Sequence, residues 1–342
     1  MSGAERAPQS EDALEEMLSR PCASLVVRLR EIPGDVIVLG AGGKMGPSLA
    51  RMVKRADASR RVIAVSRWTQ AAAESTLRAA GIETCRADLR DPREVDRLPS
   101  APNVVFMAGQ KFGTSGNPSA TWAMNAAVPA FVAERFAGAR VVVFSTGNVY
   151  PLTPIARGGS RETDDLAPVG EYAWSCLARE RLFAASAARH GTRVSIVRLN
   201  YAHDLRYGVL TDLASRIIAK EPVDLAMGHV NVVWQGDANA FAIAALARAA
   251  APEPYVVNVA GQATLRVADL AEALGTRLGV TPRFTGSEGA SALLSDSTRM
   301  RELLDRPLLP IETLLDWVAD WIARGGSLLG KPTGFQTRDG SF

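Results

Sequence analysis

The octapeptide LGAGGKMG at residues 39–46 decides the fold of this chain. An apolar, β-branched run at residues 36–39 leads into it, and apolar residues at helical spacing follow it through residues 46–55. A glycine in such a turn can take a positive φ, and without Cβ atoms the main chain can approach a pyrophosphate held at the helix N-terminus. Glycine turns without a ligand also exist, but the strand–loop–helix context favours a dinucleotide-binding loop. Its expected cofactor-binding residues are Gly40, Gly43, Lys44, Met45 and Gly46.

Further apolar runs of strand length alternate with helical stretches along the chain. The runs lie at residues 62–65, 104–107, 141–144, 194–199 and 255–259. The helical stretches between them include residues 68–80, 120–136 and 172–190. Continuous apolar strands separated by helices are typical of a parallel sheet that is buried on both faces. We therefore predict an α/β fold with a Rossmann-like, doubly wound parallel sheet.

The rest of the chain divides around this predicted sheet. Apolar residues at helical spacing on both sides of Pro21 predict two short helices before the first strand. The tail is rich in glycine and polar residues, so we expect it to be loose or to lie along the surface. The predicted units are an N-terminal helical extension (1–33), the dinucleotide-binding domain (34–200, completed by 234–262), a smaller substrate lobe (201–233 and 263–325) and the tail (326–342).

Composition excludes several classes of function. The chain has 342 residues, 47% of them hydrophobic, with a formal net charge of +3 and no basic stripe, so we expect no nucleic-acid partner. The longest apolar run, near residues 241–251, is too short to span a bilayer, and the N-terminus lacks the apolar core of a signal peptide. Three distant cysteines and three histidines form no metal motif. We expect a cytoplasmic protein with free thiols, no metal and no membrane partner.

The end of the second predicted strand bears on the choice of cofactor. An acidic residue about 20 residues after the glycine loop holds the ribose 2′-hydroxyl of NAD, but this chain has Ser66 and Arg67 there. A guanidinium and a hydroxyl suit a 2′-phosphate, and Lys44 would add a second positive charge. We therefore predict NADP, with NAD as the alternative if Arg67 only begins the next helix.

Two further strand ends should border the cofactor. Asp88 and Leu89 follow the third strand, where the adenine edge would lie, and Ala108 and Gly109 follow the fourth, where small residues would let main chain run beside the cofactor. Each pair also fits an ordinary strand end.

Two motifs make the resemblance to a known family specific. Residues 144–150, FSTGNVY, place Thr146 four residues before a tyrosine, and Tyr172 opens the sequence YAWSC. With Asn125 in the intervening helix, the chain resembles the extended short-chain dehydrogenase/reductases of the epimerase/dehydratase type, from about residue 36 to residue 322. The resemblance implies that Tyr172 is the acid/base, that Thr146 polarises the substrate oxygen, and that Asn125 and Asn200 border the cofactor. Asn200 stands one residue earlier than the family's asparagine.

The chain departs from the family at the lysine four residues after the tyrosine, where it has Cys176. In the family this lysine lowers the pKa of the phenol, which is otherwise about 10, and binds the nicotinamide ribose. Three explanations stay open. In the first, another cation takes the place of the lysine, with Lys111 as the candidate and the charge of oxidised nicotinamide assisting. In the second, Cys176 itself reacts as a thiolate. In the third, Cys176 only packs in the core of a weak or altered catalyst.

The sequence thus predicts an NAD(P)-dependent epimerase/dehydratase or reductase that acts on a hydroxyl or keto carbon of a sugar-like substrate. A nucleotide-linked sugar and a smaller sugar or hydroxy acid are rival substrates. The rival function is a cofactor sensor or scaffold that has lost catalysis. The alanine-rich helices predicted at residues 120–136 and 172–188 correspond to those that pair in the family's dimer, so we expect a homodimer.

Overall fold

The computed structural model describes residues 6–69, 71–111, 113, 116–331 and 333–341. Its centre is a seven-stranded parallel sheet in the order β12-β7-β5-β4-β1-β2-β3. The strands are β1 (Val36–Leu39), β2 (Val62–Ser66), β3 (Glu83–Arg86), β4 (Asn103–Phe106), β5 (Arg140–Thr146), β7 (Arg193–Leu199) and β12 (Tyr255–Val259). The order turns back between β1 and β4, and ligands of such sheets bind at this switch point. The predicted doubly wound fold is confirmed.

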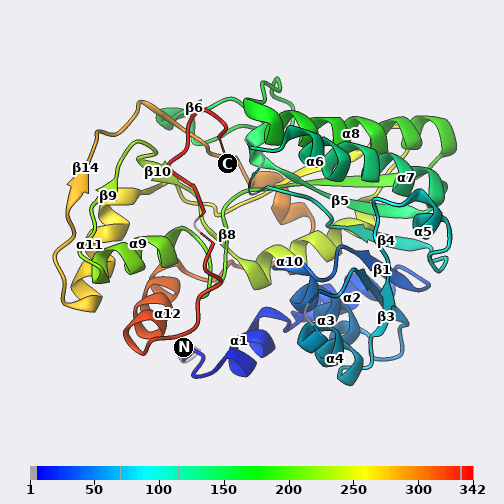
Figure 1. Cartoon of the computed structure of the whole chain (residues 1–342), viewed down its shortest axis with the longest axis horizontal. Helices are drawn as coiled ribbons and strands as arrows, with labels where there is room; N and C mark the ends of the chain where they lie inside the picture. Colours follow the sequence, from blue (N-terminus) through cyan, green and yellow to red (C-terminus); the bar gives the residue numbers. More distant parts are fainter. Residues whose placement is uncertain (1–5, 70, 112, 114–115, 332, 342) are drawn as a thin grey trace.

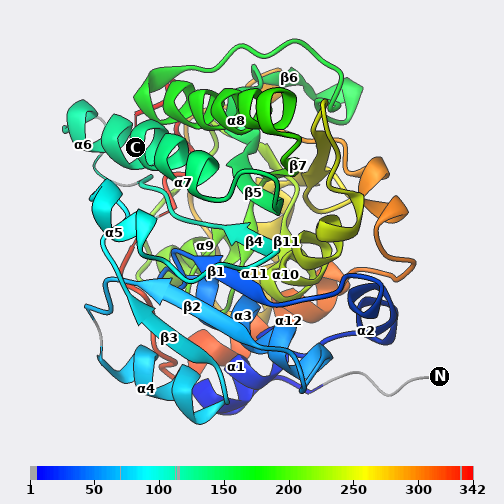
Figure 2. The same cartoon turned by 90° about the vertical axis from the view of Figure 1, so that its right-hand side faces the viewer.

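Helices cover both faces of the sheet, as Figure 2 shows. Alternate strand residues face opposite sides, so Val38 packs towards α2, α3 and α10 whereas Leu39 packs towards α5, α7 and α8. The helices up to α8 are α1 (Glu11–Leu18), α2 (Ala23–Arg30), α3 (Gly46–Ala56), α4 (Ala71–Ala79), α5 (Pro92–Asp96), α6 (Pro118–Trp122), α7 (Val128–Arg135) and α8 (Gly170–His190). The later helices are α9 (Val209–Ile218), α10 (Gln235–Ala244), α11 (Val267–Leu278) and α12 (Ile311–Ala323).

Local differences from the predicted elements have physical reasons. The predicted helix at residues 120–136 is interrupted by a π-helical turn at Ala123–Ala127, because Pro129 has no N–H to donate to the carbonyl four residues earlier. The edge strand β3 has partly exposed residues, so it forms no continuous apolar run in the sequence.

The smaller lobe has a hydrophobic core of its own, built from α9, α11 and α12 (Figure 1). Its short strands are β8 (Ala202–His203), β9 (Val223–Asp224), β10 (His229–Val230), β11 (Val233–Trp234), β13 (Leu265–Arg266), β14 (Phe284–Thr285) and β15 (Ser291–Ala292), and β15 pairs with β6 (Thr153–Pro154). The two helices predicted around Pro21 are present: Leu14 and Leu18 of α1 join the lobe core, and Leu25 and Leu29 of α2 join the core beneath the sheet. The extension therefore ties the two cores together.

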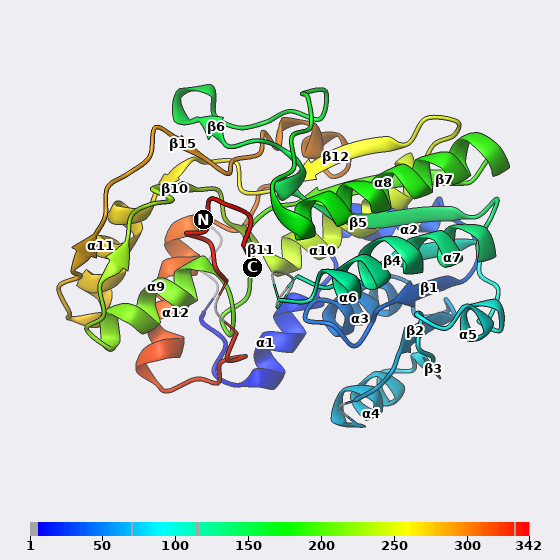
Figure 3. The same cartoon turned by 45° about the horizontal axis from the view of Figure 1, so that its top comes forward.

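The C-terminal segment differs from the expectation that it is loose or lies along the surface. Figures 1 and 3 show it running from α12 between the lobe and the sheet domain. Thr333 and Phe335 are 6% and 7% exposed. The segment is held because Phe335 packs in the lobe core and Thr333 bonds to Asp212.

No helix among the residues that the structure describes combines the length and the apolar character needed to cross a membrane.

Candidate active site

The glycine loop between β1 and α3 fits a dinucleotide. Gly40 has φ +89°, and a Cβ there would lie 2.6 Å from the Ala108 nitrogen. A Cβ on Gly46, the first residue of α3, would lie 2.4 Å from the Ala41 carbonyl oxygen. No side chain caps α3 at Met45, so main-chain N–H groups of its first turn remain to face an anion. The loop is thus closely packed against the end of β4 and offers a helix N-terminus to a pyrophosphate.

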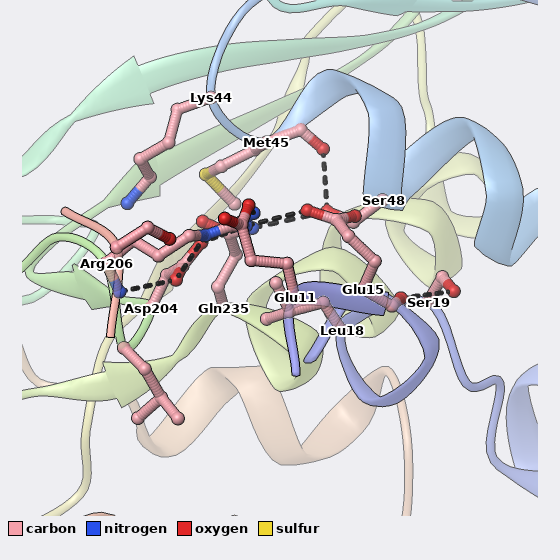
Figure 4. Close-up of polar contacts among 12 residues, drawn as sticks. Glu11, Glu15, Leu18, Ser19, Lys44, Met45, Ser48, Asp204, Arg206 and Gln235 are labelled. Atoms are coloured by element: carbon pink, nitrogen blue, oxygen red, sulfur yellow. Dashed lines mark hydrogen bonds and ion pairs between the residues drawn. The ribbon is translucent and has the colours of Figure 1, made fainter. Parts of the chain in front are cut away.

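Lys44 of this loop points to the lobe and not to the ribose end of the site. Its Nζ donates to the Ala202 carbonyl at 3.1 Å and lies 4.3 Å from the centre of the Tyr207 ring. Burial lowers the pKa of Lys44 to about 8, although Asp204 opposes this. Figure 4 shows the side chain leaving the loop on the side of Asp204 and Arg206. The predicted pairing of Lys44 with Arg67 around a 2′-phosphate is therefore not seen, because the carbonyl and the ring hold the ammonium elsewhere.

The end of β3 places a second arginine, Arg86, next to Arg67, and Arg86 also forms an ion pair with Glu74 at 3.4 Å. A Cβ on Gly42 would lie 2.4 Å from Ser66 Oγ, so Ser66 borders the loop, and Arg67 beside it is exposed. Arg86 donates to the Arg67 carbonyl at 3.0 Å. Ordinary sequence reading missed Arg86, because no motif marks an arginine at the end of an edge strand.

The predicted adenine-side residues are placed as follows. Asp88 is paired with Arg90 at 2.5 Å, and this hydrogen bond, with a smaller contribution from Arg67, lowers the pKa of the carboxyl. Leu89 and Ala108 are buried. The carboxylate of Asp88 is therefore already bonded within the chain.

Thr146 and Tyr172, predicted as partners, do meet. Thr146 ends β5, Tyr172 lies in the first turn of α8, and their side chains are hydrogen-bonded. Tyr172 also bonds to the Cys176 side chain. Burial raises the pKa of the phenol, and Cys176 raises it further, whereas the bond to Thr146 and the charge of Arg179 lower it. Without a cation this phenol is a poor base at neutral pH.

Cys176 is fully buried next to Tyr172. Burial raises the pKa of the thiol above its ordinary value, and the nearby charges of Arg179 and Lys111 oppose the rise. The predicted substitute cation, Lys111, does lie close to Cys176, and its Nζ donates to the Thr333 carbonyl at 3.3 Å. Burial lowers the pKa of Lys111 to about 8. A raised thiol pKa disfavours a reactive thiolate.

Arg179 is a buried cation that the sequence analysis missed. It follows Cys176 by one helical turn on α8, so both side chains are on the same face, and its side chain leans back towards the helix N-terminus. Its guanidinium donates to the Phe144 carbonyl and to Asn125 Oδ1, both at 2.7 Å. A Cβ on Gly109 would lie 2.8 Å from Arg179 Nη2. The seven-residue spacing from Tyr172 was the signal that could have identified it.

Asn125 and Asn200, predicted beside the cofactor, are bonded to the protein. Asn125 lies in the π-helical turn and is 0% exposed; its amide bonds both main-chain groups of Gln110, and it also donates to Ser175 Oγ. Asn200 donates to Asn231 Oδ1 at 3.1 Å and to the Leu293 carbonyl at 3.2 Å. Asn125 thus positions the end of β4, and Asn200 ties the sheet to the lobe.

A buried ion pair fixes α8 against the sheet. Arg198 of β7 bonds to Glu180 through two hydrogen bonds, at 3.0 and 2.8 Å, and to the Tyr150 hydroxyl at 2.7 Å. Ser145, beside Thr146, donates to the same carboxylate at 2.5 Å. This network holds β5, β7 and α8 in one geometry and so positions the Thr146–Tyr172 pair.

Comparisons with known proteins agree with this geometry. A model of the NAD dependent epimerase/dehydratase family matches residues 36–260. No curated protein sequence matches the chain at a significant level. MoeE5 in complex with UDP-glucuronic acid and NAD is similar with a TM-score of 0.71 and 21% identity, over 85% of this chain and 99% of that chain.

Two further solved structures share the fold. UDP-glucuronic acid 4-epimerase from Bacillus cereus has a TM-score of 0.70 and 14% identity, and a UDP-galactose 4-epimerase has 0.68 and 22%. Each match covers 85% of this chain and 99% of the other.

Proposed function

Because the chain belongs to the NAD dependent epimerase/dehydratase family, we propose that it is an NADP-using epimerase, dehydratase or reductase that acts at a hydroxyl or keto carbon of a sugar-like substrate. The observation that carries the proposal is the hydrogen-bonded pair of Thr146 and Tyr172, taken together with the glycine loop. The two regions are joined through the end of β4, where Gly40 contacts Ala108 and Gly109 contacts Arg179.

The residues of the pair have complementary roles. A bound nicotinamide would exchange a hydride with the substrate carbon. Tyr172 takes the proton of the substrate hydroxyl, or returns it to the keto oxygen, and Thr146 holds the same oxygen by a hydrogen bond. Arg179 supplies positive charge that favours the phenolate, and Lys111 acts on the neighbouring Cys176. Cys176 is then a small packing residue next to Tyr172.

The arginines at the ends of β2 and β3 support NADP over NAD. Arg67 is exposed beside Ser66, and Arg86 is bonded to its main chain. Two guanidinium groups at this end of the sheet suit a 2′-phosphate, which can bind them through several charge-assisted hydrogen bonds.

The substrate and the assembly are proposed more generally. Related structures are named for UDP-sugars, which favours a nucleotide-linked sugar over a free sugar or hydroxy acid. A homodimer is supported by large apolar side chains exposed on α6 and α8: Trp122 is 39% and Trp174 is 52% exposed.

One observation favours the rival function, a cofactor sensor or scaffold. Burial raises the pKa values of both Tyr172 and Cys176, so neither is ionised near neutral pH unless the cations suffice. A sensor would bind the nucleotide through the glycine loop without turnover.

The test combines fluorescence titration with NADPH and NADH and a turnover screen of UDP-sugars and hydroxy acids. We expect tighter binding of NADPH. Tyr172→Phe should lower turnover by about 10²–10⁴-fold and leave NADPH binding unchanged. Tyr255→Phe is the matched control, because Tyr255 lies on the edge strand β12 and not on β5 or α8, which carry the pair. Nucleotide binding without turnover of any substrate would favour the rival function, and turnover that survives Tyr172→Phe would refute the acid/base role of Tyr172. Failure to bind either nucleotide would refute both functions.

A further inference from the structure

The C-terminal segment lies where it can control the candidate site. We define the strap as residues 333–341. Figure 3 shows it between the lobe and the helices of the sheet domain. Its Thr333 lies against Lys111, which neighbours Cys176, the side chain that bonds to Tyr172. The start of the strap is therefore separated from the proposed acid/base by the side chains of Lys111 and Cys176.

Thr333 is bound both by the sheet domain and by the lobe. Lys111, after β4, donates to its carbonyl oxygen at 3.3 Å. Asp212, on α9 of the lobe, accepts from its N–H at 2.8 Å and from its hydroxyl at 2.6 Å through one carboxylate oxygen, Oδ2. Lys111 and Asp212 thus offer one donor and one acceptor to a group that presents an oxygen and a hydroxyl.

The rest of the strap is held by the lobe and by the start of α8. Arg338 donates to the carbonyls of Ala226 and Ser291 at 3.0 and 2.8 Å. Gly340 packs so closely against Gly170 that a Cβ on Gly170 would lie 2.5 Å from the Gly340 carbonyl oxygen. Gly170 is the first residue of α8, two residues before Tyr172. The strap thus runs from the contact with Lys111 and Asp212 to the start of the helix that carries the candidate acid/base.

We propose that Lys111 and Asp212 form a binding subsite for a hydroxyl-bearing sugar flanked by an anionic oxygen, and that Thr333 occupies this subsite until such a ligand displaces the strap. The proposal rests on the proposed function, because it takes the region beside Tyr172 as the place of ligand binding. A sugar hydroxyl next to a phosphate or carboxylate presents the same pattern as Thr333: an oxygen acceptor for Lys111 and an O–H donor for Asp212. The group can come from the nicotinamide dinucleotide or from a nucleotide-linked sugar.

The test follows hydrogen–deuterium exchange of the strap in the full-length protein. The probes are NADPH alone, UDP-glucuronic acid alone and both together. A ligand that only adds contacts slows exchange, so faster exchange of the strap on binding marks displacement. Release by NADPH alone assigns the subsite to the cofactor, and release that requires UDP-glucuronic acid assigns it to the substrate.

A pair of variants makes the test specific. Thr333→Val keeps the shape of the side chain but removes the hydroxyl that bonds to Asp212. This variant should speed hydrogen–deuterium exchange of the strap without ligand. It should also tighten ligand binding up to about tenfold, because releasing the strap costs less free energy. Thr337→Val, the matched control within the strap, should do neither; the Thr337 amide bonds to Gly334.

The outcomes separate this proposal from the proposed function. Ligand binding that leaves strap exchange unchanged or slower, with equal affinity for Thr333→Val and wild type, overturns the strap proposal and leaves the proposed function standing. No binding of either probe to Thr333→Val, although its strap exchanges faster, overturns the proposed function, and the subsite with it.

Discussion

Arg179→Met tests whether the buried guanidinium replaces the lysine that the family has four residues after its tyrosine. Methionine keeps a long unbranched side chain but loses two 2.7 Å hydrogen bonds, to the Phe144 carbonyl and to Asn125 Oδ1. Each hydrogen bond to a charged group contributes about 1.5–3 kcal/mol, so we expect the loss of two to lower the free energy of unfolding by about 3–6 kcal/mol. Urea denaturation measures this loss.

The charge has a second, functional effect with a definite sign. Arg179 lowers the pKa of Tyr172, so its removal raises that pKa, by about one unit for a cation at close range in a partly buried site. In the proposed mechanism, the phenolate of Tyr172 is the base that takes the substrate proton in the oxidative direction. The rising limb of the pH–rate profile should therefore move up by about one pH unit, with about a tenfold loss of rate at neutral pH.

Two further variants decide whether this effect is electrostatic. Arg181→Met is the matched control, because Arg181 lies exposed on the same helix. Adding Cys176→Lys to Arg179→Met returns a cation to the family's position and should restore much of the pH profile even if stability stays low. Our reasoning is refuted if Arg179→Met unfolds more easily but keeps the pH profile of Arg181→Met, because Arg179 would then be structural only.

Two more substitutions test the cofactor and the assembly. Arg67→Ala should weaken NADPH binding about 10–100-fold in the fluorescence titration and leave NADH binding unchanged. Arg93→Ala, at an exposed position of α5, should affect the binding of neither nucleotide. Equal losses for both nucleotides would contradict a 2′-phosphate site. Trp174→Asp should convert a homodimer to a monomer, as measured by sedimentation velocity. Val27→Asp, at a 59% exposed position on α2, should leave the dimer intact. A dimer that persists in Trp174→Asp would contradict an interface on α8.

The sequence was most informative where local patterns decide the structure. The glycine loop, six of the seven strands and both N-terminal helices were predictable, because backbone requirements at Gly40 and the alternation of apolar runs depend on neighbouring residues. The partnership of Thr146 and Tyr172 came from two short motifs of the family. β3 was harder to identify, because an edge strand is covered less and its residues are mixed.

The remaining features depend on contacts between distant segments. Lys44 turns to the lobe because Ala202 and Tyr207, more than 150 residues later, accept its ammonium. The Gly-rich composition of the tail predicts a loose segment, whereas Asp212 and Lys111, distant in the sequence, bind Thr333. No periodicity or motif encodes such pairings.

The position of Arg179 also bears on how the cofactor is held. A lysine at position 176 would have a single flexible ammonium to share between the phenol and the ribose, as in the family. The guanidinium of Arg179 is instead fixed by Phe144 and Asn125, so it can act on Tyr172 through its charge but is not free to follow a ribose. Without that anchor, we expect dinucleotide affinity to depend more on the glycine loop and on the proposed 2′-phosphate contact. The NADP preference that we propose at Arg67 would then be coupled to the loss of the lysine at 176, because a phosphate contact would offset the missing ribose contact.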